Sequence, residues 1–214
     1  MSDNQFRLSI YLLGFVLGFV LMGFEMLGSR FLNPWFGSGI FTWAAIISVT
    51  LFSLMVGYFA GGRLVDRLPD TRVLGVLVLL AAASMAVIAM PLGKDEVGVS
   101  VYLGPVVARM LGESAGAGAT GVTLAAMAVL FVPVTLIACY SPFAVRLLLV
   151  STDASGSQTG TVYGVSTFGN ILGTWATSFW LIPSIGSAAI TWWFAGITTI
   201  CGLILLRIGQ LQRR

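Results

Sequence analysis

Six apolar segments, each about long enough to cross a bilayer, dominate the sequence and limit what it can fold into. A hydrocarbon core requires about 20 apolar residues per helix. Only 9% of the 214 residues are charged, against about 25% in an ordinary soluble domain, which leaves too little polar surface to cover a soluble core. We therefore predict one all-α integral membrane domain over residues 1–214, with transmembrane helices at about 8–31, 40–61, 73–92, 120–140, 161–182 and 188–206.

The basic residues predict how these helices are oriented. If six helices alternate across the membrane, one side carries Arg7, Arg63, Arg67, Arg72, Arg146, Arg207, Arg213 and Arg214. The other side carries only Arg30, Lys94 and Arg109, the last two in an outer loop expected over residues 93–119. Short loops rich in Arg and Lys remain cytoplasmic. We therefore predict that both termini are cytoplasmic, in a bacterial-type inner (plasma) membrane.

An acidic residue lies deep in the first apolar segment, within GFEMLGSRFLNPWF at residues 23–36. Glu25 falls about three quarters of the way along that helix, where facing lipid would cost at least ~2.5 kcal/mol. Arg30 lies about 140° around the helix from it, so Arg30 is better placed to extend to the interface. Glu25 is then either a buried carboxyl that fixes helix packing or a site that responds to cations or protons. Asn33 and Pro34 are expected to end the helix.

The fifth segment is small and polar for a transmembrane helix. Gly169 and Gly173 form a G-x-x-x-G pair, a pattern that favours close packing of two membrane helices. Asn170 lies near the middle of the membrane and Tyr163 near the inner end. Two interpretations follow: a tightly packed interior helix, or a helix that lines a polar cavity with Asn170 and Tyr163 facing it.

A third pattern, G-x-x-x-D-R, ends the second segment with Asp66 and Arg67. It fits either a latch on the inner face of a moving transporter or a basic anchor with a local salt bridge. Catalysis is not expected, because the chain has no histidine and no paired carboxylates or nucleophile–base spacing within the membrane. Cys139 and Cys201 lie in apolar runs and are predicted to be small buried hydrophobes, so we expect no metal site and no cofactor.

Three stretches together resemble a known family. They are EMLGSRFLNPWFGS at residues 25–38, followed by Trp43, then GYFAGGRLVDR at 57–67 and TVYGVSTFGNILGT at 161–174. In this order they are similar to the membrane domain of the fused major-facilitator/spermidine synthase family. The resemblance implies a half-major-facilitator-like three-plus-three bundle. No synthase motifs follow the sixth segment, so we expect the enzyme half to be absent or a separate polypeptide.

These observations lead to two functional hypotheses. The first is a transporter-like component for a small polar or cationic metabolite, such as a polyamine, that works with a separate synthase-like partner. The second is a non-transporting subunit that anchors or scaffolds a larger enzyme complex. Beyond the lipid bilayer we expect a homodimer or hetero-complex and no nucleic acid. The expected substrate-binding residues are Glu25, Asn170, Tyr163 and Trp43, and the expected structural or gating residues are Arg30, Pro34, Asp66, Arg67, Gly169 and Gly173.

Overall fold

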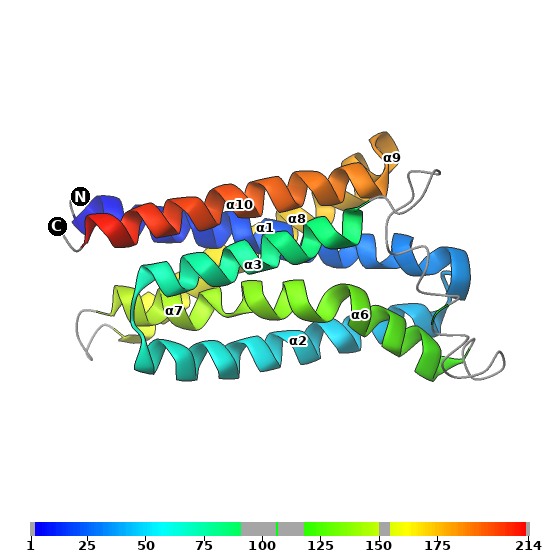
Figure 1. Cartoon of the computed structure of the whole chain (residues 1–214), viewed down its shortest axis with the longest axis horizontal. Helices are drawn as coiled ribbons and strands as arrows, with labels where there is room; N and C mark the ends of the chain where they lie inside the picture. The colour runs from blue at the N-terminus through cyan, green and yellow to red at the C-terminus, as the bar shows by residue number, and fades with distance from the viewer. Residues whose placement is uncertain (1–2, 91–105, 107–117, 150–154, 213–214) are drawn as a thin grey trace.

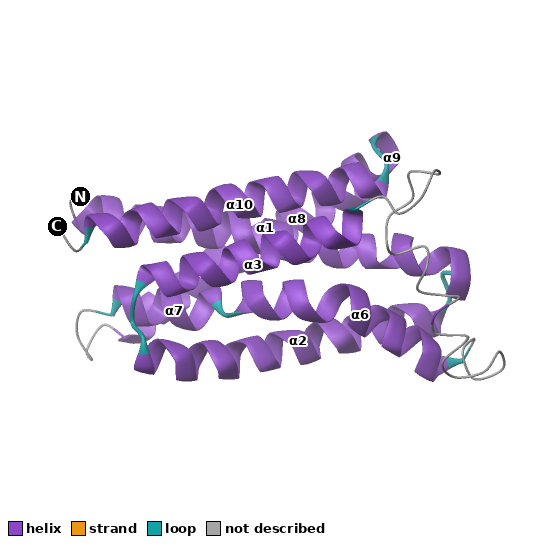
Figure 2. Ribbon diagram, in the orientation of Figure 1, coloured by secondary structure: helices purple, strands orange, loops and turns teal. Residues whose placement is uncertain are grey.

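The computed structural model describes residues 3–90, 106, 118–149 and 155–212, and the regular structure within these ranges is entirely helical (Figure 2). The predicted all-α class is therefore confirmed. In this described part, five helical segments are long and apolar enough to cross a membrane, as a multi-pass membrane bundle requires. They are α1 (Asp3–Phe36), α2 (Ile40–Arg67), α3 (Thr71–Ala89), α6 (Ala119–Ala138) joined to α7 (Tyr140–Leu148), and α10 (Ser187–Leu211).

A sixth long helix, α8 (Ser155–Ala176), occupies the fifth predicted segment. It is less apolar than the other five because glycine, serine and threonine make up much of it, and it falls short of their hydropathy. Its axis continues through a π-helical turn, η2 (Thr177–Leu181), into the short α9 (Ile182–Ser184).

The long helices lie side by side along the molecule, and the two chain termini meet at the same end of the bundle (Figure 1). Three pairs of helices pack most extensively: α1 with α8, α2 with α6, and α3 with α10. Helix α1 also contacts α2, α6 and α10, so it runs through the centre of the bundle.

The α1–α8 pair packs through glycines. A side chain added at Gly169 would overlap the carbonyl oxygen of Phe15, and one added at Gly173 would overlap that of Phe19. In the opposite direction, a side chain at Gly18 would overlap the carbonyl oxygen of Ser166. Such close backbone approach is the arrangement in which Cα–H···O contacts form and small residues drive helix association in lipid.

The C-terminal end of α1 differs from the prediction. The helix does not stop at Asn33 and Pro34 but continues to Phe36. Pro34 lies in the last turn of this helix, and it cannot donate the hydrogen bond that an N–H at this position would make to the Arg30 carbonyl oxygen. Gly37 then ends the helix with a positive φ of 69°, and its N–H donates to the Asn33 carbonyl oxygen over 2.9 Å, as in the common glycine-terminated helix.

Proline and aspartate explain two other helix ends. Helices α6 and α7 are separated at Cys139, three residues before Pro142, which has no N–H to continue the helical ladder and crowds the carbonyl four residues earlier. Helix α3 begins after Asp70, whose carboxylate accepts a hydrogen bond of 2.8 Å from the Arg72 N–H. This is the usual N-terminal cap of a helix.

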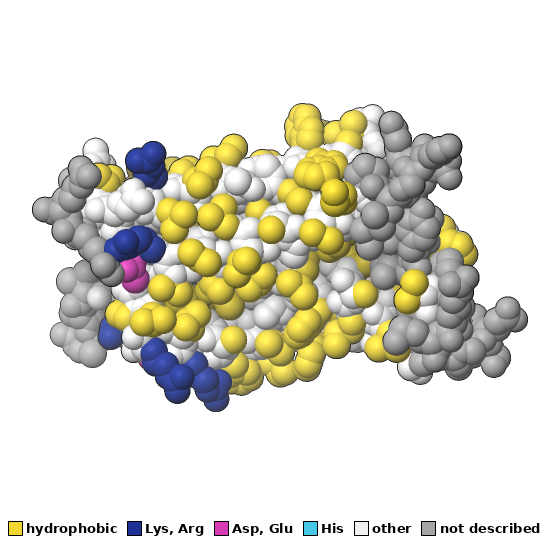
Figure 3. Space-filling view, in the orientation of Figure 1, with side chains coloured by type: hydrophobic (Ala, Val, Ile, Leu, Met, Phe, Trp, Pro, Cys, Tyr) yellow, Lys and Arg dark blue, Asp and Glu magenta, His cyan; other side chains and the backbone are white. Residues whose placement is uncertain are grey.

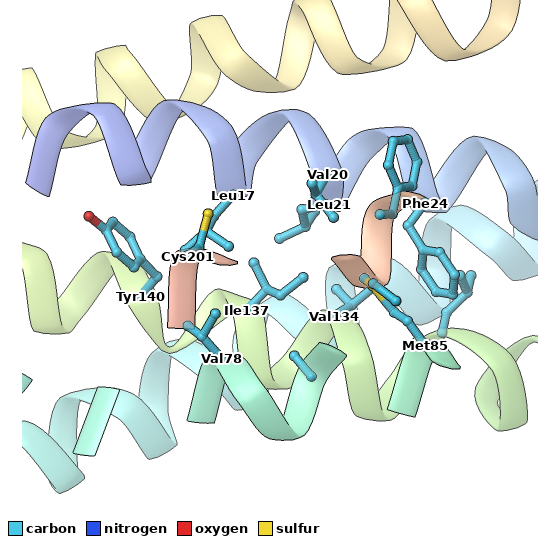
Figure 4. Close-up of a cluster of buried hydrophobic side chains, with 14 of the residues drawn as sticks. Leu17, Val20, Leu21, Phe24, Val78, Met85, Val134, Ile137, Tyr140 and Cys201 are labelled. Atoms are coloured by element: carbon cyan, nitrogen blue, oxygen red, sulfur yellow. The ribbon is translucent and has the colours of Figure 1, made fainter. Parts of the chain in front are cut away.

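The interior is apolar and continuous between α1, α3, α6 and α10. Cys139 and Cys201 are both buried and free, which confirms that they act as small hydrophobes. Figure 4 shows a part of this core in which side chains of α1 face those of α3, α6, α7 and α10: Leu17, Val20, Leu21, Phe24, Val78, Met85, Val134, Ile137, Tyr140 and Cys201.

Basic side chains gather at the end of the bundle that carries the termini (Figure 3). The helix bounds bring Arg7, Arg63, Arg67, Arg72, Arg146 and Arg207 to this end. The opposite end carries Arg30 among the described residues. The outer loop predicted at 93–119, with Lys94 and Arg109, lies outside the described residues except for positions 106, 118 and 119, and so do Arg213 and Arg214.

The local salt bridge that one of the two interpretations places at the end of α2 does not form within the described residues. Asp66 and Arg67 are exposed and take part in no ion pair there. As consecutive helical residues they project about 100° apart, which separates their charged ends. The ion pair at this corner is instead Asp70–Arg72, with 3.5 Å between Oδ2 and Nε.

Candidate functional site

A small cavity lies inside the bundle, in the half nearer the termini. Its volume is about 60 Å³, enough for about four water molecules at 10–15 Å³ each on this measure. Four helical segments enclose it: α1, α2, the α6–α7 junction and α8. Its lining residues are Gly14, Leu17, Gly18, Leu21, Leu54, Tyr58, Ile137, Ala138, Tyr140, Ser141, Tyr163, Ser166, Thr167 and Asn170.

Two lining oxygens have no hydrogen-bond partner within the described structure. They are the hydroxyl Oγ of Ser166 and the amide Oδ1 of Asn170, and both atoms are buried. Most buried polar atoms in folded proteins are paired, and an unpaired one costs stability until water or a ligand satisfies it. A cavity beside two such oxygens is therefore suited to hold a polar occupant.

Three tyrosines surround the same space. Tyr140 is only 3% exposed, and its hydroxyl donates a hydrogen bond to the Ile10 carbonyl oxygen on α1. Tyr58 on α2 and Tyr163 on α8 are 38% and 40% exposed, and their rings meet edge to face with centroids 6.4 Å apart. Tyr140 thus forms a fixed inner wall, whereas Tyr58 and Tyr163 stand together on the exposed side between α2 and α8.

The wall of the cavity on α1 is formed in part by glycines, which leave the cavity space unfilled. A side chain at Gly18 would approach Asn170 Oδ1 to 2.8 Å. One at Gly14 would approach both Ser166 Oγ and the Tyr140 ring to 3.1 Å. Any residue larger than glycine would therefore press on the polar lining.

Glu25 is buried in the same bundle but does not line this cavity. It is 7% exposed and follows Gly18 on the same face of α1, two turns or about 10 Å further along. The Thr50 hydroxyl on α2 interacts with the carboxyl. Among the described residues Glu25 has no ion pair, so Arg30, which is exposed, does not neutralise it.

The structure therefore brings together only part of the predicted site. Asn170 and Tyr163 line one cavity, with Gly169 and Gly173 on the adjoining α1-facing side of α8. Trp43 is half-buried in the first turn of α2, at the end remote from the cavity.

Several lining residues were not predicted. Tyr58, Tyr140 and Ser166 contribute to the cavity without having been identified from the sequence. A signal for them was available in two further G-x-x-x-G pairs, Gly14 with Gly18 and Gly57 with Gly61. Side chains added at these four glycines would collide with α8, α6 or α7, so these positions pack closely against neighbouring helices.

Between the cavity and the end of the bundle that carries the termini, side-chain hydrogen bonds of Gln158 link three helices. The side-chain amide of Gln158, oriented to satisfy both neighbours, donates to the Leu148 carbonyl oxygen over 2.9 Å and accepts from Arg7 over 3.0 Å. It connects the first turn of α8 with α7 and with the start of α1. Together with the Tyr140–Ile10 bond, it holds these three helices together on the terminal side of the cavity.

Comparison with known proteins does not assign the chain to a family. No protein-family model matches the chain, and searches of curated proteins and of solved structures find no match either. The resemblance to the fused major-facilitator/spermidine synthase family stays a prediction.

Proposed function

We propose that the protein is a transporter-like membrane component that binds a small polar or cationic metabolite in the cavity between α1, α2, α6–α7 and α8. The observation that carries this proposal is the pair of unpartnered buried oxygens, Ser166 Oγ and Asn170 Oδ1, beside that cavity. A helix that only anchored another protein would gain nothing from keeping these oxygens unsatisfied.

The pattern of helix contacts supports a three-plus-three arrangement. The exchange of α1 with α6, of α2 with α8 and of α3 with α10 tests for such a repeat. It turns the closely packed pair α1–α8 into the other closely packed pair, α6–α2, and it leaves the pair α3–α10 unchanged. The four segments around the cavity are also exchanged among themselves. Transporters built from such repeats bind their substrates at the repeat interface, near the middle of the membrane.

The orientation and setting are part of the same proposal. The basic end of the bundle is cytoplasmic under the positive-inside rule, so both termini face the cytoplasm of a bacterial-type inner membrane. The cavity then lies in the cytoplasmic half of the protein, and Glu25 lies towards the outer side. A homodimer, or a complex with a separate synthase-like protein, completes the assembly.

The charges around the cavity favour neutral or cationic solutes over anions. Among the described residues the cavity lining contains no Lys or Arg, so no positive charge there would compensate a buried anion. Glu25 is the one acidic residue in the membrane-spanning part of the described helices, about 10 Å from Gly18 along α1. A cation that passes between the outer side and the cavity would meet this carboxyl first.

Uptake into proteoliposomes tests the proposal. Radiolabelled putrescine and spermidine, with erythritol as a neutral polyol, are offered to vesicles that contain the protein. Thr167→Trp should block uptake, because Thr167 is exposed and lines the cavity. Phe168→Trp is the matched control, because Phe168 is also exposed but lies outside the lining.

Uptake that Thr167→Trp removes and Phe168→Trp retains supports the proposal. The absence of uptake for every solute would contradict it. If an enzyme then co-purified with the protein at a fixed ratio, the non-transporting scaffold would become the better account.

A further inference from the structure

We infer that the cavity recognises the ammonium head of a primary amine. This inference rests on the proposed function, since it names the ligand class of the same cavity. It rests on three properties of the described lining: unpaired acceptor oxygens, aromatic rings and the absence of any charged side chain among the lining residues that the structure describes.

The unpaired oxygens define the hydrogen-bonding character of the ligand. An amide Oδ1 only accepts hydrogen bonds, so Asn170 requires a donor. The Ser166 hydroxyl can also accept one. An ammonium group carries three N–H donors and no acceptor, so it would satisfy both oxygens without leaving an acceptor of its own unpaired. A carboxylate or phosphate offers only acceptors and would leave Asn170 Oδ1 unsatisfied.

The tyrosines supply the second element of recognition. A cation within about 6 Å of an aromatic centroid is attracted by the negative face of the ring. Tyr58, Tyr140 and Tyr163 all border the cavity, and Tyr58 meets Tyr163 edge to face at its exposed side. Rings and neutral oxygens together compensate a positive charge without a buried carboxylate.

The size of the cavity limits what enters it. A volume of about 60 Å³ corresponds to about four water molecules, which matches an ammonium group with a short alkyl chain and excludes a nucleotide or an acyl chain. The lining turns apolar where Leu17, Leu21 and Leu54 complete it, so the methylene groups next to the ammonium would contact leucine side chains.

Equilibrium binding to the purified full chain in lipid nanodiscs tests the inference without requiring transport. The probe is radiolabelled butylamine, and the competitors are unlabelled butylamine and butanol, which has a similar length but no charge. The inference predicts saturable binding of butylamine that butanol fails to displace.

Three variants relate the binding to the lining. Tyr163→Leu removes a ring and should weaken butylamine binding about 5- to 30-fold, whereas Phe168→Leu removes an exposed ring outside the cavity and should leave it unchanged. Asn170→Ala removes the amide oxygen and should weaken binding about tenfold or more. Because Asn170 Oδ1 has no partner to lose, this variant should unfold at the same temperature as the unmodified protein or at a higher one, which separates loss of binding from loss of fold.

The outcomes distinguish the inference from the function on which it rests. Equal competition by butanol and butylamine would overturn the ammonium inference while leaving a site for small polar molecules. Saturable butylamine binding that is unchanged in Tyr163→Leu and Asn170→Ala would also overturn it, because the amine would then bind elsewhere. Binding of neither molecule would overturn it as well, and solute uptake in proteoliposomes would then decide the proposed function independently.

Discussion

Replacing Gly169 by alanine should weaken the packing of α8 against α1, whereas the same change at Gly164 should not. Both glycines lie on α8, five residues apart. A methyl group at Gly169 would overlap the backbone carbonyl oxygen of Phe15, whereas at Gly164 no atom lies within 4 Å of the added carbon. The pair therefore compares one chemical change in a tightly packed and in an open environment on one helix.

The magnitudes follow from three contributions. Replacing a helical glycine by alanine stabilises the helix by about 0.5–1 kcal/mol at either position. At Gly169, overpacking against a backbone atom that cannot rotate away costs about 1–3 kcal/mol, and loss of the Cα–H···O contact costs about 0.5–1 kcal/mol. Gly169→Ala should therefore destabilise by about 0.5–3.5 kcal/mol, whereas Gly164→Ala should stabilise by up to about 1 kcal/mol.

Unfolding of the purified protein in mixed micelles, titrated with a denaturing detergent and followed by tryptophan fluorescence, measures the difference. Gly173→Ala, which would meet the Phe19 carbonyl oxygen in the same way, should behave like Gly169→Ala. Identical unfolding midpoints for Gly164→Ala and Gly169→Ala would refute the close packing of α1 on α8.

Three further changes test other parts of the structure. A thiol reagent that does not cross membranes should label Ser155→Cys from the cytoplasmic side and Ser38→Cys from the outside of intact cells; the reverse pattern would invert the proposed orientation. Glu25→Gln should leave the unfolding midpoint unchanged, because the described structure gives the carboxyl no ion pair to lose and the amide can still interact with the Thr50 hydroxyl; a clear loss of stability would reveal a charged partner. Tyr140→Phe should destabilise by about 1 kcal/mol, since the phenol donates to the Ile10 carbonyl oxygen, and an unchanged unfolding midpoint would contradict that bond.

The sequence was sufficient to predict the helical class, because apolar segments of that length and so few charges leave no soluble alternative. The sequence also identified Asn170 and Tyr163 as candidates to line a cavity, because polar residues are unusual in a membrane segment, and both do line the cavity. Helix ends were harder to predict. Proline disfavours the continuation of a helix without always ending it, and only the structure shows that α1 continues past Pro34 to Phe36.

The cavity as a whole could not be predicted from local patterns. Its lining comes from four segments, so it depends on which helices are neighbours in the bundle. The spacing of residues along the sequence does not show that α1 packs on α8. Tyr58 and Tyr140 look like ordinary membrane aromatics until the fold brings them beside Ser166. The expectation that Glu25, Asn170 and Trp43 share one site assumed such a neighbourhood, whereas the helices distribute these residues along the bundle.

Ligand protection of a cysteine in the cavity tests the central claim most directly. In a chain whose Cys139 and Cys201 are replaced by alanine, Thr167→Cys places a thiol in the cavity lining, and Phe168→Cys places one on an exposed position outside it. A small water-soluble thiol reagent should modify position 167 faster than position 168, because the cavity admits water and lipid surrounds the other position. Putrescine should slow the reaction at position 167 alone. Equal rates at both positions, or a rate at 167 that putrescine leaves unchanged, would contradict a ligand-binding cavity between α1, α2, α6–α7 and α8.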